Sequence, residues 1–393
     1  MQKTLRYSEF ININKMDYSK YEVVIIGGDH YNTLWTARSL GSVGIKTFVI
    51  VWAPKISKSF VCTSKYVNKY RIVHDEEEVL NILTSHECQE KRVLFSSSDQ
   101  AAEFVDKNYD ILSNNYYLAG CDATKGNLNH WLDKKNMLDL AKKVGLNVAY
   151  TICVDLSKGF DMKDLSEIPY PCLIKPELSS HGSKNDYRIC ENSDGLSTAL
   201  HSLENVCNQV LIQEFLKPEY EATLTGIACD NVQIPTVVHK LRTCKDLQNL
   251  GMIVFSKLDN DVDKVISTLQ VESLIEKMGY KGCFSVDLMH AKGKTYFLEV
   301  NLRTDGTMYM STSAGVNFPL AWVDYCLFHK QSNLCLKKAI HAMTEISYVK
   351  YLDYRHPLRC MKEWFMTDCY SIFFWRDIKP FIFKILYAIK NKR

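Results

Sequence analysis

The sequence predicts an α/β unit, then an α+β unit with an antiparallel sheet, and last a basic helical extension. Three observations support this order: a strand–glycine turn–helix–strand pattern near the start, a two-faced hairpin near residue 290, and positive charge gathered after residue 330. We expect units at 1–120, 121–330 and 331–393. The middle unit would divide into a smaller part, 121–208, and a larger part, 209–330.

The first unit has short apolar runs separated by a helical pattern, as a doubly wound sheet requires. Its strands are expected at Tyr21–Ile26, Ile45–Val51 and Arg92–Phe95, with a helix at Thr33–Leu40. Ligands of such sheets bind at the carboxyl ends of strands, here Gly27–His30 and Ser96–Asp99. The Gly-Gly turn lacks the full G-x-G-x-x-G pattern, so a structural turn and a ligand-contacting turn both stay open.

The middle unit mixes helical patterns with several strand-like runs. Helices are expected near Asn129–Val144 and at Asp261–Lys277, and strands at Ala149–Val154, Cys172–Lys175, Val210–Leu216, Ala222–Ala228 and Val232–His239.

A hairpin from Cys283 to Arg303 follows, with its turn at Gly293. One face would hold Phe284, Val286, Leu288, Leu298, Val300 and Leu302. The other face would place Asp287 opposite Glu299, with Asn301 two residues further. Two facing carboxylates repel, and Mg²⁺ bound to nucleotide phosphates would relieve this. A solvated sheet face with incidental charges is the alternative.

Composition limits the class of protein. The 393 residues are 46% hydrophobic and 24% charged, which is typical of a globular protein, and the net charge of +3 indicates no nucleic-acid partner. The 14 cysteines show no CxxC pair or zinc-ligand spacing, so we expect reduced thiols and a cytoplasmic location. We expect neither a secretory signal nor a spanning helix.

The last unit carries the excess positive charge. Residues 337–393 hold 12 Lys/Arg and 5 Asp/Glu, and Pro380 divides the final aromatic and lysine-rich stretch. Peripheral contact with the inner membrane and a helix packed on its own domain both remain open.

Two lysines and an acidic segment precede the hairpin. Lys134 lies at the start of a helix, and Lys175 closes an apolar strand where its ammonium needs a partner such as a phosphate. Gln213-Glu-Phe-Leu216, with Glu221 further on, would suit a bound adenosine.

The order of these segments resembles the ATP-grasp superfamily of carboxylate–amine ligases over roughly residues 20–325. Glu299-Val-Asn-Leu-Arg303 is similar to that family's Glu-Val-Asn-Pro-Arg motif, with Leu302 in place of proline. The loop Ser179–Asn185 has one glycine, fewer than a phosphate-covering lid often has, and gives His181 no role.

The resemblance implies a binding site for ATP and Mg²⁺, with Mn²⁺ as a substitute metal. It assigns Lys134 (or its neighbour Lys135), Lys175 and Ser183 to the phosphates, Glu214, Phe215 and Leu216 to adenine, Glu221 to ribose, Asp287, Glu299 and Asn301 to the metal, and Arg303, Arg242 and Lys175 to catalysis.

The implied activity joins a small-molecule carboxylate, activated as an acyl phosphate, to an amine or amino acid. Phe95–Asp99 looks like the corresponding segment of enzymes that act on cell-envelope precursors, such as D-aspartate ligases. A carboxylating or carbamoyl-phosphate-type enzyme is one alternative. A non-catalytic nucleotide-binding protein recruited by its tail is another.

Overall fold

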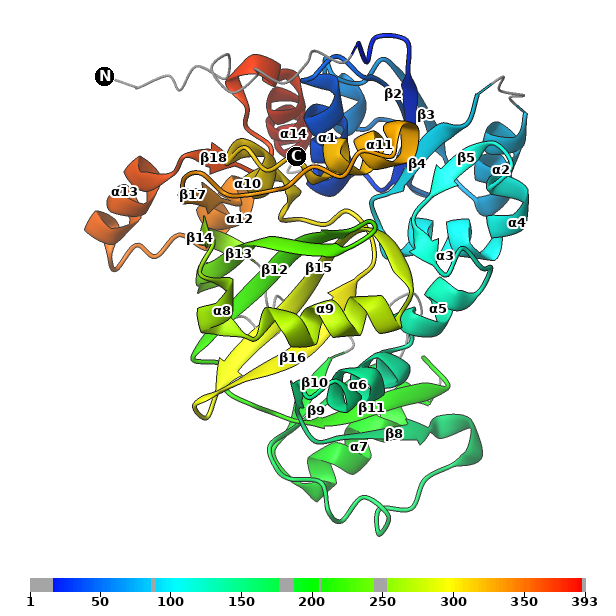
Figure 1. The fold of residues 1–393 in the computed structure, drawn as a ribbon. Helices are drawn as coiled ribbons and strands as arrows, with labels where there is room; N and C mark the ends of the chain where they lie inside the picture. The colour runs from blue at the N-terminus through cyan, green and yellow to red at the C-terminus, as the bar shows by residue number, and fades with distance from the viewer. Residues whose placement is uncertain (1–16, 86–89, 177–186, 205, 244–252, 391–393) are drawn as a thin grey trace.

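The computed structural model describes residues 17–85, 90–176, 187–204, 206–243 and 253–390. Their strands form one parallel sheet and two largely antiparallel sheets (Figure 1). The predicted order, an α/β unit followed by an α+β unit with antiparallel sheets and a helical C-terminal part, is confirmed.

The N-terminal unit is a five-stranded parallel sheet in the order β3-β2-β1-β4-β5. Its strands are β1 (Glu22–Gly27), β2 (Lys46–Trp52), β3 (Lys69–Val73), β4 (Arg92–Ser96) and β5 (Tyr116–Leu118). Its helices are α1 (Tyr31–Gly41), α2 (Glu76–Thr84), α3 (Asp99–Lys107) and α4 (Tyr109–Leu112), with a 3₁₀ turn η2 (Val61–Thr63). Helices on both faces bury β1, which explains its unbroken apolar sequence.

The small lobe is a four-stranded antiparallel sheet in the order β10-β9-β11-β8 that projects from the body in Figure 1. It comprises β8 (Thr151–Asp155), η3 (Leu156–Lys158), β9 (Cys172–Pro176), β10 (Arg188–Cys190), α7 (Ser193–Leu203) and β11 (Gln209–Glu214). The chain reaches it through β6 (Gly120–Cys121), α5 (Asn127–Leu132), α6 (Lys134–Lys143) and β7 (Asn147–Val148). Leucines of α7 pack on Ile174 and Ile212, which gives the lobe its own core.

The large sheet has nine strands, eight of them in the order β18-β17-β14-β13-β12-β15-β16-β7. New strands here are β12 (Tyr220–Ala228), β13 (Val232–Thr243), β14 (Ile253–Asp259), β15 (Tyr280–Ala291), β16 (Lys294–Asn301), β17 (Ile340–Met343) and β18 (Cys369–Tyr370). The associated helices are α8 (Val262–Val265), α9 (Thr268–Lys277), α10 (Met308–Ser313) and α11 (Phe318–Phe328). One helix was predicted over 261–277, but Ile266 is extended and separates α8 from α9.

The C-terminal segment packs on both larger units. It contains α12 (Glu345–Lys350), α13 (Pro357–Met366), η6 (Trp375–Asp377) and α14 (Lys379–Lys390), and its strands β17 and β18 extend the large sheet. The Arg38 guanidinium lies 2.9 Å from the Asp377 carboxylate, and both side chains are buried. Pro380 is the second residue of α14, where it costs no helical hydrogen bond. No helix within the described ranges is long and apolar enough to cross a membrane.

Candidate functional site

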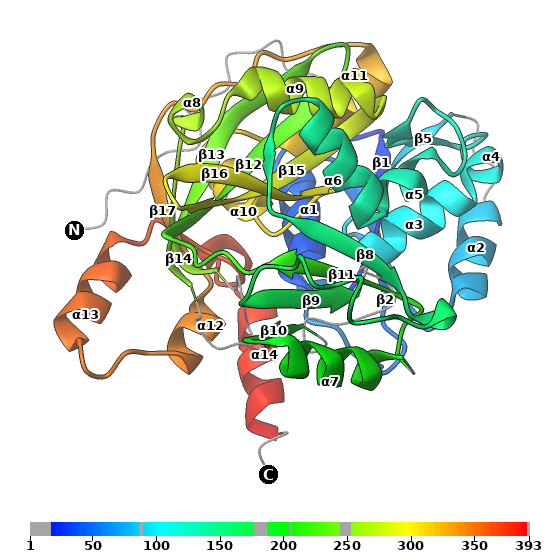
Figure 2. The same cartoon turned by 90° about the horizontal axis from the view of Figure 1, so that it is seen from below.

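Strand alternation gives the large sheet one apolar face and one polar face. Ala222 and Leu224 of β12 and Val286 of β15 share a core with α6 and α9. The intervening residues point to the other face and include acids, hydroxyls and an amide: Glu221, Thr223, Thr225, Ser285, Asp287, Glu299 and Asn301. The small lobe faces this polar surface (Figure 2).

The acidic pair lies where the sequence places it. Asp287 pairs with Glu299 across the hairpin, and Ser285 pairs with Asn301. The predicted apolar face needs one correction. A bulge between Asp287 and Leu288 brings Phe297, not Leu298, opposite Leu288, so Phe297 is fully buried while Leu298 is half-buried.

Lys240 of β13 joins this acidic group and was not among the predicted site residues. Its Nζ lies 3.3 Å from a Glu221 oxygen and 3.5 Å from Asp287 Oδ1, and its side chain is only 7% exposed. Thr223 also donates a hydrogen bond of 2.5 Å to Asp287. Burial opposes the ammonium, but Asp287, Glu221 and Glu299 together raise the pKa of Lys240. The Lys240 ammonium is therefore a cation already bound between these carboxylates.

The structure brings the two predicted phosphate lysines together. Lys134 at the start of α6 and Lys175 of β9 are both buried, whereas Lys135 is exposed. Lys175 Nζ donates to Gln213 Oε1 at 3.3 Å. Burial and repulsion from Lys134 lower the pKa of Lys175 to about 8, although the Glu299 carboxylate attracts its ammonium. Lys175, with Lys134 close to it, is thus within electrostatic reach of Glu299 on the hairpin.

The segment predicted to line an adenine site follows β11. Lys292 Nζ lies 2.6 Å from Glu214 Oε1, and the Phe215 N–H donates to the Pro171 carbonyl at 2.9 Å. Leu216 is buried against Ala149 and Ala291. Ser183 and His181 lie outside the described residues.

Arg303 lies between the hairpin and the N-terminal unit. Its guanidinium makes two hydrogen bonds to Asp99, of 2.7 and 3.2 Å, and donates to Asn301 Oδ1 at 3.0 Å. Burial opposes the charge, but Asp99 outweighs it and raises the pKa of Arg303. Asp99 begins α3 directly after β4, so this pair connects the two units at the carboxyl edge of the parallel sheet.

The glycine turn after β1 has mainly structural contacts. A Cβ at Gly27 would collide with the Thr33 hydroxyl, which explains the glycine, whereas Gly28 has open space. Asp29 accepts a hydrogen bond from Ser59 at 2.6 Å, and His30 caps α1.

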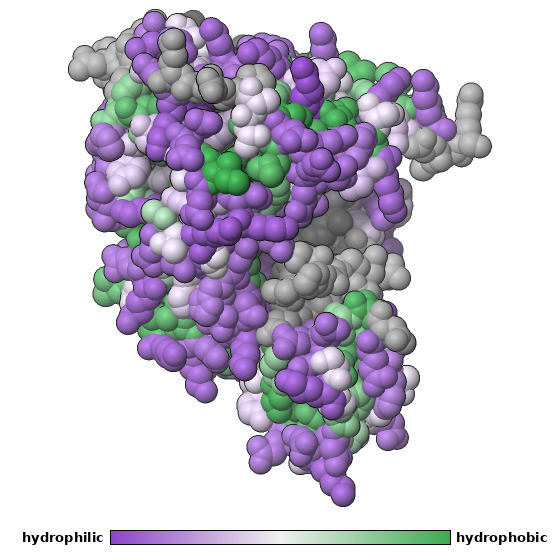
Figure 3. Space-filling view, turned by 90° about the vertical axis from the view of Figure 1, so that its right-hand side faces the viewer, coloured by the Kyte–Doolittle hydropathy of each residue, from purple (hydrophilic) through white to green (hydrophobic). Residues whose placement is uncertain are grey.

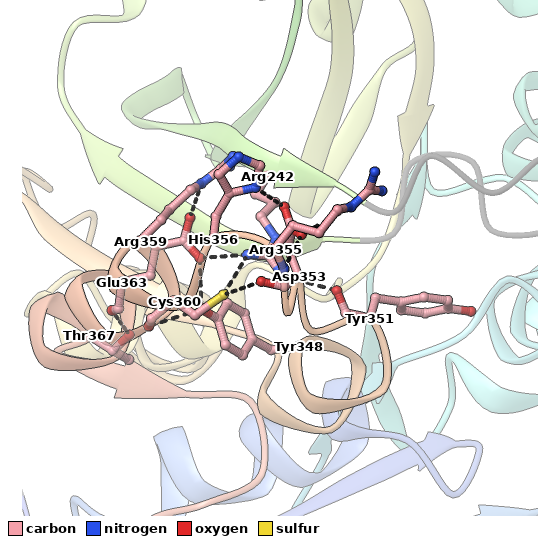
Figure 4. A network of polar contacts seen from close by, with 10 residues as sticks. All are labelled: Arg242, Tyr348, Tyr351, Asp353, Arg355, His356, Arg359, Cys360, Glu363 and Thr367. Carbon is pink, nitrogen blue, oxygen red and sulfur yellow. Dashed lines mark hydrogen bonds and ion pairs between the residues drawn. The ribbon is translucent and has the colours of Figure 1, made fainter.

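Arg242 does not join the cluster, although its strand also carries Lys240. A bulge in the β13–β14 pairing inserts Leu241 and turns Arg242 toward the C-terminal segment. There Arg242 lies 3.0 Å from Glu363 and above the Tyr348 ring (Figure 4). The sequence analysis assigned Arg242 to catalysis as a second cation, whereas in the structure its guanidinium binds Glu363 in the C-terminal segment.

The donor set fits a hard divalent cation in part. Asp287 and Glu299 supply two carboxylates, which together with substrate phosphates is a usual set for Mg²⁺. Asn301 Oδ1 already accepts from Arg303, so a metal would share that oxygen. Within the described residues, no group of three or more His, Cys, Asp or Glu side chains could hold a metal by itself. Phosphate oxygens would therefore be needed to complete the coordination.

Figure 3 views the molecule from the side and shows the small lobe as a separate projection below the main body. The surface in this view is mostly hydrophilic, with hydrophobic residues scattered over it.

Residues 209–349 match a family model described as "ATP-grasp in the biosynthetic pathway with Ter operon". The formate-dependent phosphoribosylglycinamide formyltransferase of Wolinella succinogenes is 27% identical over 148 residues, which is 36% of this chain and 36% of that protein. The Ignicoccus hospitalis enzyme of the same name is 26% identical over 156 residues, 36% of this chain and 37% of that protein. The matched region thus spans little more than a third of these relatives.

Solved structures match over most of the chain. The L-amino acid ligase from Bacillus licheniformis has a TM-score of 0.63 at 14% identity and covers 82% of this chain and 79% of that one. The N5-carboxyaminoimidazole synthetase from Staphylococcus aureus, complexed with ADP, has a TM-score of 0.63 at 17% identity and covers 88% of each chain. Biotin carboxylase from Campylobacter jejuni has a TM-score of 0.62 at 13% identity, and the match covers 81% of this chain and 74% of that one. These likenesses show a shared fold.

Proposed function

Because residues 209–349 match an ATP-grasp family model, we propose that the chain is an ATP-dependent ligase that forms an amide bond between a carboxylate and an amine or amino acid. The observation that carries this proposal is the arrangement of charges. Buried Lys175, with Lys134 close to it, is attracted by Glu299 of the Asp287–Glu299 pair, and Arg303 on the same hairpin pairs with Asp99 of the N-terminal unit.

In this proposal the nucleotide lies between the small lobe and the polar sheet face. Lys134, Lys175 and Ser183 would bind its phosphates, and Glu221 would accept from the ribose. Adenine would lie beside Glu214, Phe215 and Leu216. Since the Phe215 N–H already donates to Pro171, the backbone of Leu216 is the better contact for the ring. Asp287, Glu299 and Asn301 would hold Mg²⁺, which neutralises charge on the transferring phosphate when bound.

The chemistry needs no enzyme nucleophile. A carboxylate oxygen attacks the γ-phosphorus, the bond to ADP breaks, and an acyl phosphate forms. The amine nitrogen then attacks the acyl carbon, phosphate departs, and the nitrogen loses a proton to solvent. Arg303, fixed by Asp99, would neutralise the acyl phosphate at the edge of the N-terminal unit.

A carboxylating reaction is the second candidate, and the comparisons favour keeping it. Structures of N5-carboxyaminoimidazole synthetase and biotin carboxylase match as well as the amino acid ligase does. In that case bicarbonate would be the carboxylate that ATP activates, and the rest of the site would act in the same way.

We also propose a role in cell-envelope or surface-polysaccharide synthesis. The protein would then be cytoplasmic and would bind peripherally to the inner membrane. The similarity of Phe95–Asp99 to cell-envelope ligases supports the first idea, and the basic C-terminal segment supports the second.

A phosphate-release screen tests the proposed reaction. Amino acids and amines are combined with carboxylate donors, and separately with bicarbonate, in the presence of ATP and Mg²⁺. We expect release that requires both an amine and a carboxylate, and its loss in Asp287→Asn and Glu299→Gln. Glu276→Gln, exposed on α9 over the opposite sheet face, is the matched control and should keep full activity. Release that needs bicarbonate would favour the second candidate, and unchanged turnover in both site variants would refute the site.

A further inference from the structure

The helix α13 presents an apolar stripe to solvent. It lies at the margin of the molecule in both Figure 1 and Figure 2. Leu358 is 80% exposed and Phe365 82% exposed, and Met361 lies between them on the same helical face. Ile346, Val349, Tyr354, Trp364 and Met366, which lie on α12, on α13 and between the two helices, are exposed as well. A concentration of large exposed apolar residues in one segment marks an interaction site more often than single scattered ones do.

Most of the exposed charges around the stripe are positive, although Asp368, two residues after Met366, is exposed too. Lys350, Arg355, Arg359 and Lys362 are exposed. The two carboxylates nearest to them in the helices, Glu345 and Glu363, are buried. Asp353 is partly exposed and pairs with His356 at 2.8 Å. The outward surface of α12 and α13 is therefore cationic as well as apolar.

The buried acids are held from inside the protein. Glu363 accepts from Arg242 at 3.0 Å and from Arg359 at 2.9 Å (Figure 4). Glu345 accepts from the backbone N–H groups of Ser371, Ile372 and Phe373. The Arg242–Glu363 contact holds the Glu363 side of α13 against β13, while Leu358, Met361 and Phe365 lie on its exposed side.

We propose that the α12–α13 segment is a docking surface for an anionic lipid bilayer. Large apolar and aromatic side chains flanked by Arg and Lys are suited to the boundary between acyl chains and headgroups. The cations would add attraction to anionic lipids at the surface. The stripe is on a projecting helix and not in a groove, which fits a flat and deformable surface such as a bilayer. This inference gives the proposed membrane contact of the C-terminal segment a definite surface, and it does not rest on the proposed ligase activity.

Co-sedimentation of the full-length protein with vesicles tests the proposal. One set of vesicles contains phosphatidylcholine alone, and the other contains phosphatidylcholine with phosphatidylglycerol. We expect binding to the anionic vesicles that weakens as salt is added. Leu358→Ser with Phe365→Ser should weaken it at least about tenfold. Leu269→Ser, which alters a side chain 74% exposed on α9, is the matched control and should bind as the wild type does.

A second variant keeps the test valid if the apolar variant folds poorly. Arg355→Glu with Lys362→Glu changes only exposed positions and should abolish the preference for anionic vesicles. Absence of wild-type binding, or equal binding by the apolar variant, would overturn the proposal. A solution dimer that Leu358→Ser with Phe365→Ser dissociates, without vesicle binding, would instead identify a second copy as the partner and would also overturn it.

Discussion

Replacing Lys175 with methionine should stabilise the free protein near neutral pH while weakening nucleotide binding. Lys175 is buried, and its pKa falls from 10.5 to about 8 through burial and repulsion from Lys134. At about 1.36 kcal/mol per pKa unit, this difference corresponds to about 3 kcal/mol of destabilisation by the charged form. The lost hydrogen bond to Gln213 offsets about 1 kcal/mol of the gain, so the net increase should be about 2 kcal/mol.

The sign of this effect depends on pH. Below about pH 8 the lysine is charged in both the folded and unfolded states, so the folded protein bears the full penalty. As the pH rises from about 8 toward 10.5, folding increasingly takes place with a neutral lysine and the penalty disappears. The stabilisation by Lys175→Met should therefore fall to about zero near pH 10, where the small remaining penalty and the lost hydrogen bond offset each other.

Urea unfolding at pH 7 and pH 10 measures the effect, and titration with MgATP measures the loss of binding. Lys163→Met, an exposed lysine in the same lobe, is the matched control and should change little at either pH. A destabilised Lys175→Met protein at pH 7, or an equal gain at both pH values, would refute the reasoning about this ammonium. Such a pattern of stability lost for function is common at binding sites.

Two further predictions concern Lys240 and Arg242, both on strand β13. Lys240→Met should lower the free energy of unfolding by about 2 kcal/mol, because Glu221 and Asp287 lose their shared cation. Added Mg²⁺ should restore more stability to this variant than to the wild type, and urea unfolding with and without MgCl₂ measures the difference. Equal Mg²⁺ effects in the two proteins would contradict this. Arg242→Met should cost about 2 kcal/mol, because buried Glu363 then keeps only Arg359 as a cationic partner, and adding Glu363→Met should recover part of that loss in a double-mutant cycle. Strictly additive losses would show that the two side chains are not coupled.

The hairpin was predictable because its physics is local. Alternation fixed the two faces, and Gly293 with Lys292 makes the tight turn, since both have positive φ. That register placed Asp287 opposite Glu299 correctly. Lys134 and Lys135 could not be separated by sequence alone, because the side of α6 that faces the lobe is set by tertiary packing.

Bulges account for what the sequence could not predict. The bulge in the hairpin places Phe297 in the core, where alternation predicted Leu298. The bulge in β13 directs Arg242 away from Lys240. No residue pattern marked either bulge. Lys240 itself could have been noticed, because the acid Glu221 on a neighbouring strand needs a partner, but its pairing with Glu221 depends on a register that only the folded sheet defines.

Calorimetric titration of MgATP into the wild type, Glu299→Gln and Arg242→Met tests the central claim most directly, because it separates the hairpin cluster from the C-terminal network. We predict that the wild type and Arg242→Met bind MgATP alike, and that Glu299→Gln binds at least about tenfold more weakly. Absence of binding by the wild type, or equal binding by Glu299→Gln, would contradict a nucleotide site at the Asp287–Glu299 hairpin.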